Sequence, residues 1–248
     1  MARQGTNDTR DDAIFELVNA GDWSFFHLPE LEEAGISHGF CTGTSPSEFL
    51  DMDIKKRFLE TFHLNDIVTM QQVHGNTVHT IRNGEKPEAG DGLVLMEKGI
   101  AGIIRTADCL PIILCDVSRP LVSIVHSGWR GTAARIVEKA VDAMERLGAA
   151  KENVVALLGP SIGSCCYEVK EDVRAVFRKK GFPEHIFRER DRSMFLDIRE
   201  ANACALRDCG VNRVYDTGLC TCCEPAYFYS FRRGDKGRRQ INFVSIRG

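Results

Sequence analysis

The sequence predicts an α+β fold built on a mixed or antiparallel β-sheet, and three observations lead to this class. Short apolar runs recur through the chain and are separated by Gly, Asn and Pro residues. Most connections between these runs are too short for the helical crossovers that parallel strands require. Two longer segments show helical periodicity. With 248 residues, of which 43% are hydrophobic, the chain is long enough to bury a substantial core.

The strands are expected where the apolar runs lie. Residues 23–26 are interpreted as the start of an edge strand. Further strands are predicted at residues 67–73, 77–81, 92–96, 101–106, 111–117, 121–125, 154–158, 211–215 and 241–246.

Two helices are predicted. The first spans residues 131–147, where apolar residues recur at helical spacing until Gly148 can end the helix, and we expect it to pack on the sheet. The second begins at Asp197, whose carboxylate can cap the first turn, and Glu200 completes a pattern that resembles a capping box. Residues Ile198, Ala201, Ala205 and Cys209 form its apolar stripe.

Composition and charge limit the classes of partner. Residues 1–12 are polar and are expected to be a disordered segment, and residues 13–248 to form one domain, because no linker or repeat interrupts them. The net charge of −3 gives no general attraction for nucleic acid or an anionic membrane. A local basic cluster, interpreted as solvated surface or a small-anion site, comprises Arg232, Arg233, Lys236, Arg238 and Arg239.

Location and redox state follow from the same composition. The chain has no signal-peptide pattern and no apolar run near the ~20 residues that span a bilayer, so a cytoplasmic location is expected. The ten cysteines are about 4% of the residues, below the level of secreted disulfide scaffolds, and are interpreted as reduced thiols. Nothing in the sequence selects an oligomeric state.

Three residues predict a catalytic metal site. His74 and His126 each end an apolar β-branched run and precede a glycine-containing turn, and Cys109 follows the run 101–106. A thiolate and two imidazoles suit zinc, with copper as the less favoured metal. Three protein ligands would leave a fourth coordination position open for substrate or water, which is typical of catalytic zinc.

Two other cysteine clusters compete as metal sites. They are Cys165-Cys166 and the segment 220–223, Cys-Thr-Cys-Cys. Neither presents the two C-x₂₋₄-C pairs of a tetrahedral structural site, nor a partner at a fixed offset. A second, structural zinc is therefore not expected.

These segments resemble the laccase-domain family, whose members have been labelled polyphenol oxidases, purine nucleoside phosphorylases and peptidoglycan editing factors. The motifs Gln-Val-His (72–74), Ala-Asp-Cys (107–109), His-Ser-Gly-Trp (126–129), residues 159–169 and residues 229–233 carry the resemblance, which runs from Phe25 to Ile246. It implies an α-β-β-α sandwich around a mixed sheet. It also implies zinc ligation by His74, Cys109 and His126, phosphorolysis of adenosine, inosine and methylthioadenosine, and deamination of adenosine.

The two implied reactions need different groups. Deamination requires a carboxylate to carry a proton from the attacking water to the leaving ammonia, and Asp108 and Asp91 are the candidates. Asp108 has an alternative role, since a carboxylate beside a metal ligand can fix its loop by accepting hydrogen bonds. Phosphorolysis requires donors for inorganic phosphate. Arg130 is one candidate, with a solvated arginine as the alternative, and the backbone amides of residues 159–163 are another, with an ordinary tight turn as the alternative.

The chain departs from the family pattern at Gly43. The family commonly has an arginine there that can bind an anion, so phosphorolysis is predicted to be weaker than the metal content suggests. Arg105 lies within an apolar run and offers a replacement, or it points to the solvent side of a strand.

Three other functions stay open. Copper-dependent phenol oxidation fits poorly, because seven scattered histidines do not form the several histidine-rich motifs of multicopper sites. Hydrolysis of a cell-wall precursor would use Cys109 as a free nucleophile, which zinc binding would oppose. An inactive metal-binding module is the third alternative, and Gly43 is its best support.

Overall fold

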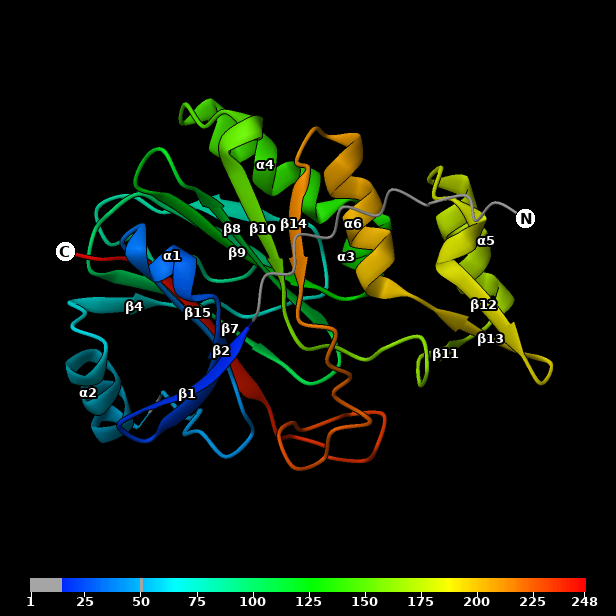
Figure 1. The fold of residues 1–248 in the computed structure, drawn as a ribbon, viewed down its shortest axis with the longest axis horizontal. Coiled ribbons are helices and arrows are strands. Elements are labelled where there is room, and N and C mark those ends of the chain that lie inside the picture. The colour runs from blue at the N-terminus through cyan, green and yellow to red at the C-terminus, as the bar shows by residue number, and fades with distance from the viewer. Residues whose placement is uncertain (1–14, 50) are drawn as a thin grey trace, which may run out of the picture.

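Two mixed β-sheets pack face to face in the computed structural model, which describes residues 15–49 and 51–248. Helices cover the outer faces of the two sheets, as Figure 1 shows. This arrangement confirms the expected α+β class and the α-β-β-α sandwich. The predicted disordered segment 1–12 lies outside the described residues.

The first sheet has six strands. Their order is β1 (Glu16–Ala20), β2 (Trp23–His27), β3 (Ile36–Cys41), β15 (Gln240–Ile246), β7 (Ile100–Thr106) and β4 (Asp66–Val68). Only the pair β4 and β7 is parallel. The expectation that residues 23–26 form an edge strand was wrong, because β1 pairs with β2 and takes the edge position.

The second sheet also has six strands and carries the candidate metal ligands. Their order is β14 (Arg213–Asp216), β10 (Val154–Leu158), β8 (Leu110–Asp116), β9 (Leu121–Ser127), β6 (Gly92–Leu95) and β5 (Val78–Thr80). The central strands β10, β8, β9 and β6 are antiparallel, whereas the outer pairs β10–β14 and β5–β6 are parallel. Both large sheets are therefore mixed.

Three apolar layers hold the sandwich together. Phe40, Ile104 and Val244 of the first sheet meet Leu93 and Ile113 of the second. The outer face of the first sheet packs on α2 (Met52–Thr61), and the outer face of the second packs on α4 (Ile136–Arg146) and α6 (Ile198–Asp208). Burial on both faces explains why most central strands are continuous apolar runs.

The predicted helix 131–147 is two helices. α3 (Trp129–Ala133) ends before Arg135, whose φ of 54° is left-handed, and α4 then begins at Ile136. Periodicity could not reveal the break, since the apolar residues keep their spacing across it. The second predicted helix is confirmed as α6, with the Asp197 carboxylate accepting a hydrogen bond from the Glu200 amide at 3.1 Å.

A small satellite layer lies beyond α6. It contains α5 (Glu171–Lys179) and a three-stranded sheet of β11 (Glu168–Val169), β13 (Ser193–Leu196) and β12 (Phe187–Arg190). A short helix, α1 (Pro29–Glu33), joins β2 to β3.

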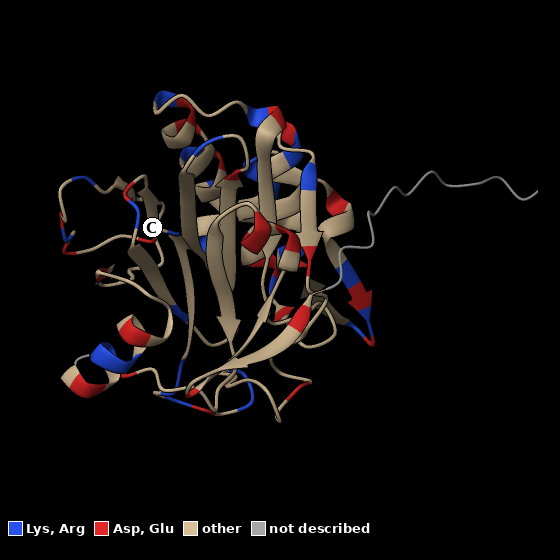
Figure 2. Cartoon of the chain, turned by 60° about the vertical axis from the view of Figure 1, so that its left-hand side comes forward, with Lys and Arg blue, Asp and Glu red and all other residues tan. Residues whose placement is uncertain are grey.

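The charged residues gather on helices and loops, as Figure 2 shows, while the central strands are nearly free of them. Within the described part of the chain, no helix combines the length and apolar character needed to cross a bilayer.

Candidate metal centre and cavity

The three predicted ligands converge at one end of the second sheet. His126 lies in β9 opposite Pro111 of β8, and Cys109 immediately precedes β8. His74 comes from a turn in which its own φ is 56°, because β4 ends at Val68 and not at the predicted residue 73. The Cys109 Sγ lies 3.9 Å from His74 Nδ1, and the two imidazole rings have centroids 4.8 Å apart. One ligand atom from each residue lies within 4.8 Å of the others.

Asp91 orients the two histidines of this cluster through hydrogen bonds. Its carboxylate is fully buried and accepts hydrogen bonds from the His126 Nδ1–H at 2.8 Å and from the amides of His74 and Gly75 at 3.0 and 2.6 Å. The bond to Nδ1 leaves Nε2 of His126 free for a metal, an arrangement found around many ligating histidines. Its burial and these three hydrogen bonds support a positioning role for Asp91 and give no support to the expected role as a proton carrier for the substrate.

The electrostatics of the cluster favour a thiolate. Burial opposes ionisation of Cys109, but hydrogen bonds from His126 and His74 outweigh it and lower the pKa of the thiol to about 6. Burial alone would lower the pKa of His126, but the hydrogen bonds with Asp91 and Cys109 raise it to about 9. Both shifts favour a thiolate beside an imidazolium in the metal-free protein, and a divalent cation can replace the proton.

Gly128 leaves room for such a cation. A Cβ at this position would lie 3.1 Å from His74 Nδ1 and 3.2 Å from Cys109 Sγ, in the space that the ligands surround. The φ of Gly128 is −77°, which any residue adopts, so the backbone conformation does not require glycine. The space and the donor set both fit a metal held by one thiolate and two imidazoles.

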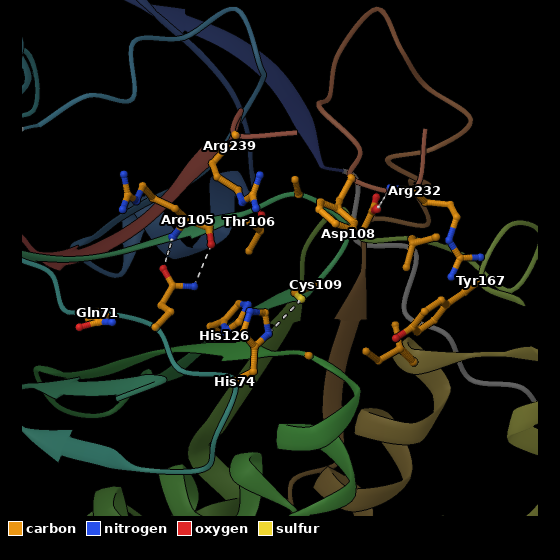
Figure 3. A pocket seen from close by; sticks show the side chains of 17 residues that line it. Gln71, His74, Arg105, Thr106, Asp108, Cys109, His126, Tyr167, Arg232 and Arg239 are labelled. Atoms are coloured by element: carbon orange, nitrogen blue, oxygen red, sulfur yellow. Dashed lines mark hydrogen bonds between the residues drawn. The ribbon is translucent and has the colours of Figure 1, made fainter. Parts of the chain in front are cut away.

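The ligands lie at the floor of a cavity of about 590 Å³, shown in Figure 3. This volume is within the range of small-molecule sites. Its polar and charged walls include Gln71, Gln72, Arg105, Asp108, Arg232 and Arg239, and its apolar walls include Ile162, Tyr167, Ile198 and Phe231.

Asp108 lines the cavity but its carboxylate is engaged. One oxygen accepts from the Thr221 hydroxyl and the other from the Arg232 amide, both at 2.7 Å. The residue itself has a φ of 85°, so these bonds hold a sharp turn just before Cys109. The geometry supports the loop-fixing role that the sequence left as an alternative to proton transfer.

The two predicted anion donors differ in position, because Ile162 of the 159–163 turn lines the cavity and Arg130 does not. Arg130 is exposed, and its guanidinium lies 4.4 Å from the Trp129 ring centroid, outside the residues that line the cavity. The amides of the 159–163 turn already donate to other groups: Gly159 to Pro111, Ser161 to Leu219, Ile162 to Asp108 and Gly163 to the sulfur of Cys220. These contacts do not support the predicted role of either donor in holding phosphate.

Other arginines occupy the cavity wall. Arg105 and Arg239 lie on one side of the metal-ligand candidates in Figure 3 and Arg232 on the other. Arg232 donates to the carbonyls of Cys166 and Glu168, whereas no carboxylate among residues 15–49 and 51–248 forms an ion pair with Arg105 or Arg239. Arg105 therefore lies in the cavity wall, which is the position required if it replaces the family arginine that is absent at Gly43.

Gly43 does not line this cavity. A Cβ there would lie 3.1–3.3 Å from the ring of Tyr229, so a larger residue would have to displace that ring. Sequence reasoning also gave no role to Tyr167 and Phe231, although both lie in motifs that carry the family resemblance. Phe231 is 55% exposed, so its ring is accessible to a molecule in the cavity.

The comparisons with known proteins agree with these motifs. The chain is 39% identical over 180 residues to a purine nucleoside phosphorylase of Deinococcus radiodurans, covering 71% of this chain and 69% of the relative. It is 34% identical over 185 residues to adenosine deaminase RL5 from an unknown prokaryotic organism, covering 68% of this chain and 71% of the relative.

A solved structure shows the same fold. The crystal structure of YlmD from Geobacillus stearothermophilus matches with a TM-score of 0.83 and 28% identity, covering 95% of this chain and 100% of that chain. The family profile described as multi-copper polyphenol oxidoreductase laccase matches residues 52–247. The motifs, the fold and this match together show that the chain belongs to the laccase-domain family.

Proposed function

We propose that this protein is a zinc-dependent purine nucleoside phosphorylase that acts on adenosine, inosine and methylthioadenosine. The observation that carries the proposal is one cavity with a metal-ligand cluster of His74, Cys109 and His126 at its floor and, on its wall, two arginines that form no ion pair within the part of the chain that the structure describes. The names of relatives at 39% and 33% identity support the same reaction.

Arg105 and Arg239 are proposed to hold inorganic phosphate. Phosphate carries roughly 1.5–2 negative charges near neutral pH, and guanidinium groups bind such oxyanions through paired hydrogen bonds. The backbone of Arg105 is fixed by Gln72, whose side chain accepts from the Arg105 amide and donates to its carbonyl, both at 2.8 Å. In the reaction a phosphate oxygen forms a bond to C1′ of the ribose while the bond from C1′ to the purine nitrogen breaks. The purine leaves with that electron pair.

Tyr167 and Phe231 are proposed to contact the purine. Both line the cavity, and aromatic faces bind purine rings through stacking. Ile162 and Ile198 add apolar wall that excludes water from the base. These contacts select a purine without fixing which one, which agrees with activity on several nucleosides.

Zinc is the proposed metal because one thiolate and two imidazoles form the donor set, whereas a multicopper centre needs more histidine ligands than this cluster supplies. When bound, zinc would supply Lewis acidity at the cavity floor. Holding Cys109 as a metal ligand would also make it a poor free nucleophile, which argues against a cysteine hydrolase.

Deamination of adenosine is a second candidate activity. The relative RL5 is named an adenosine deaminase, and Asp108 is a carboxylate in the cavity wall beside a metal ligand. Proton transfer by Asp108 would compete with the hydrogen bonds that it accepts from Thr221 and Arg232. This reaction needs water and no phosphate, so it would not depend on Arg105 or Arg239. An inactive module would show neither reaction.

The test is product chromatography from adenosine with and without phosphate. We expect adenine and ribose 1-phosphate only when phosphate is present. If deamination also occurs, inosine should form without phosphate, and hypoxanthine should be formed from it when phosphate is present. Arg105→Ala and Arg239→Ala should each raise the KM for phosphate about 10-fold or more, because a hydrogen bond to a charged group contributes ~1.5–3 kcal/mol. They should leave inosine formation without phosphate unchanged.

Arg130→Ala is the matched control, since Arg130 is an exposed arginine outside the cavity lining. Its KM for phosphate should equal that of the unmodified protein. An effect of Arg130→Ala with none for the two cavity arginines would reject the proposed phosphate site.

A further inference from the structure

Four cysteines from two distant loops form a second cluster of metal-ligand side chains. Cys165, Cys166, Cys220 and Cys223 each offer an Sγ, and these four atoms lie within 4.8 Å of one another. The Cys223 sulfur lies 3.5 Å from that of Cys165 and 3.4 Å from that of Cys166. The earlier expectation treated the two cysteine segments as separate clusters without partners, and the fold makes them partners of each other.

The topology explains the convergence. β10 and β14 are parallel neighbours, so the loops that follow them leave the same edge of the second sheet. The loops then continue side by side, with the Ser161 amide donating to the Leu219 carbonyl and the Thr221 amide donating to the Ser161 carbonyl. Gly163 permits this close approach, because a Cβ there would lie 3.2 Å from Cys165 Sγ and 3.4 Å from Cys220 Cβ.

We propose that this four-cysteine cluster binds a second zinc ion, separate from the one at His74, Cys109 and His126. Zinc bonds to thiolate sulfur at about 2.3 Å, so a tetrahedron of four sulfurs has edges of about 3.8 Å. The spread from 3.4 to 4.8 Å brackets that edge. An iron–sulfur cluster would hold its ligands around several metal atoms and needs a wider spacing, so a single ion fits better.

The surroundings suit a cluster of thiolates. Zinc with four thiolates carries two negative charges, which nearby cations stabilise. Arg190 donates to the Cys165 carbonyl, Arg232 to the Cys166 carbonyl and Arg233 to the Cys222 carbonyl, at 2.9–3.1 Å. The Gly163 amide also donates to Cys220 Sγ at 3.2 Å, a bond that stabilises a thiolate ligand.

The proposed ion would fix one wall of the cavity. Ile162 and Tyr167 line the cavity on either side of the first cysteine pair, and Thr221, between the second pair, donates to Asp108. Joining the two loops through one ion would restrain these residues together. The role is structural, because four protein ligands leave no coordination position for substrate.

The first test counts zinc per chain by elemental analysis of protein made with zinc present. We expect two ions in the unmodified protein and one in Cys109→Ala. The double substitution Cys165→Ser and Cys223→Ser should also leave one. Both of these cysteines are exposed, so the fold should tolerate the change. Cys222→Ser is the matched control, since Cys222 lies in the same loop but outside the cluster, and should retain two ions.

The second test identifies the ligands. Cobalt(II) added to metal-free Cys109→Ala should give the intense thiolate charge-transfer and tetrahedral d–d absorption of a four-sulfur site, and Cys223→Ser in that background should abolish it. A single zinc in the unmodified protein that is lost in Cys109→Ala, or two zinc ions retained in the Cys165→Ser and Cys223→Ser double variant, would overturn the proposal. So would a disulfide within the cluster, detected by mass spectrometry as two hydrogens lost and reversed by a reductant.

Discussion

Replacing Asp91 with asparagine tests how the first metal centre is held. The Asp91 carboxylate accepts three hydrogen bonds, two at Oδ1 and one at Oδ2, and it is fully buried. An asparagine of the same shape has one oxygen and one NH₂ group. Whichever way the amide is oriented, its NH₂ faces at least one buried N–H donor.

Two effects of different size follow from Asp91→Asn. An unpaired buried donor costs ~1–3 kcal/mol of folding stability. Loss of the carboxylate that orients His126 should weaken zinc binding by about 10–100-fold, because substitutions of such partners have effects of this size. That corresponds to ~1.4–2.7 kcal/mol of binding free energy.

The decrease in folding stability at acid pH should change as well. Burial alone would raise the pKa of Asp91, but the hydrogen bonds from His126 and the Gly75 and His74 amides lower it below its ordinary value. A carboxyl with a lowered pKa stabilises the fold above its unfolded pKa, and this contribution is lost as the pH falls through the folded value. Asp91→Asn should therefore flatten part of the fall in stability at acid pH.

Zinc affinity is measured by competition with a chelating indicator, and stability by urea unfolding of the metal-free protein. Asp116→Asn is the matched control, because Asp116 is also buried but lies at the far end of β8 from Cys109. It should lower stability without changing zinc affinity at the His74 site. The reasoning is refuted if Asp91→Asn binds zinc as tightly as the unmodified protein.

Three further outcomes are expected. Gly128→Ala should lower zinc affinity at this site by about 10-fold or more without changing the backbone conformation, because its Cβ would enter the space between two ligands. Unchanged affinity in the chelator competition would contradict the placement of the metal in that space. In metal-free protein, the rate of alkylation of Cys109 should rise with pH with a midpoint of about 6, because the pKa of this thiol is lowered, and zinc should protect the thiol. The rate is measured by peptide mass spectrometry, and a midpoint near 9 would contradict a stabilised thiolate. Asn202→Leu removes buried hydrogen bonds with Ser127, Thr132 and the Ile198 carbonyl and should cost ~1–3 kcal/mol in urea unfolding, with a neutral result counting against this network.

The sequence predicted much of the fold because buried strands leave a direct pattern. Strands such as β8 and β10 are buried along their whole length and read as continuous apolar runs. The satellite strands β12 and β11 are partly exposed and carry charged residues, so they gave no such pattern. The break at Arg135 was also hidden, since an arginine is not among the residue types that favour the left-handed region.

The residues of the candidate site were likewise only partly predictable from the sequence. Cys109 directly precedes β8 and His126 lies near the end of β9, so these two ligands could be found from the apolar runs, whereas His74 lies in a turn six residues after β4 ends. The roles of Asp91 and Cys223 depend on partners 35 and 57 or 58 residues away, which only the strand pairing brings together. Arg239 lies in a basic cluster whose members look alike in sequence, and its place beside Arg105 follows from the pairing of β15 with β7.

The most direct test of the proposed activity is the rate of adenine and ribose 1-phosphate formation from adenosine and phosphate. The rate is measured on the unmodified protein as purified, after metal removal and after zinc restoration. We predict equal amounts of the two products from the zinc-loaded protein, loss of both after metal removal, and recovery with zinc. Equal rates in the metal-free and zinc-loaded protein, or no phosphate-dependent product from the zinc-loaded protein, would contradict a zinc-dependent phosphorylase.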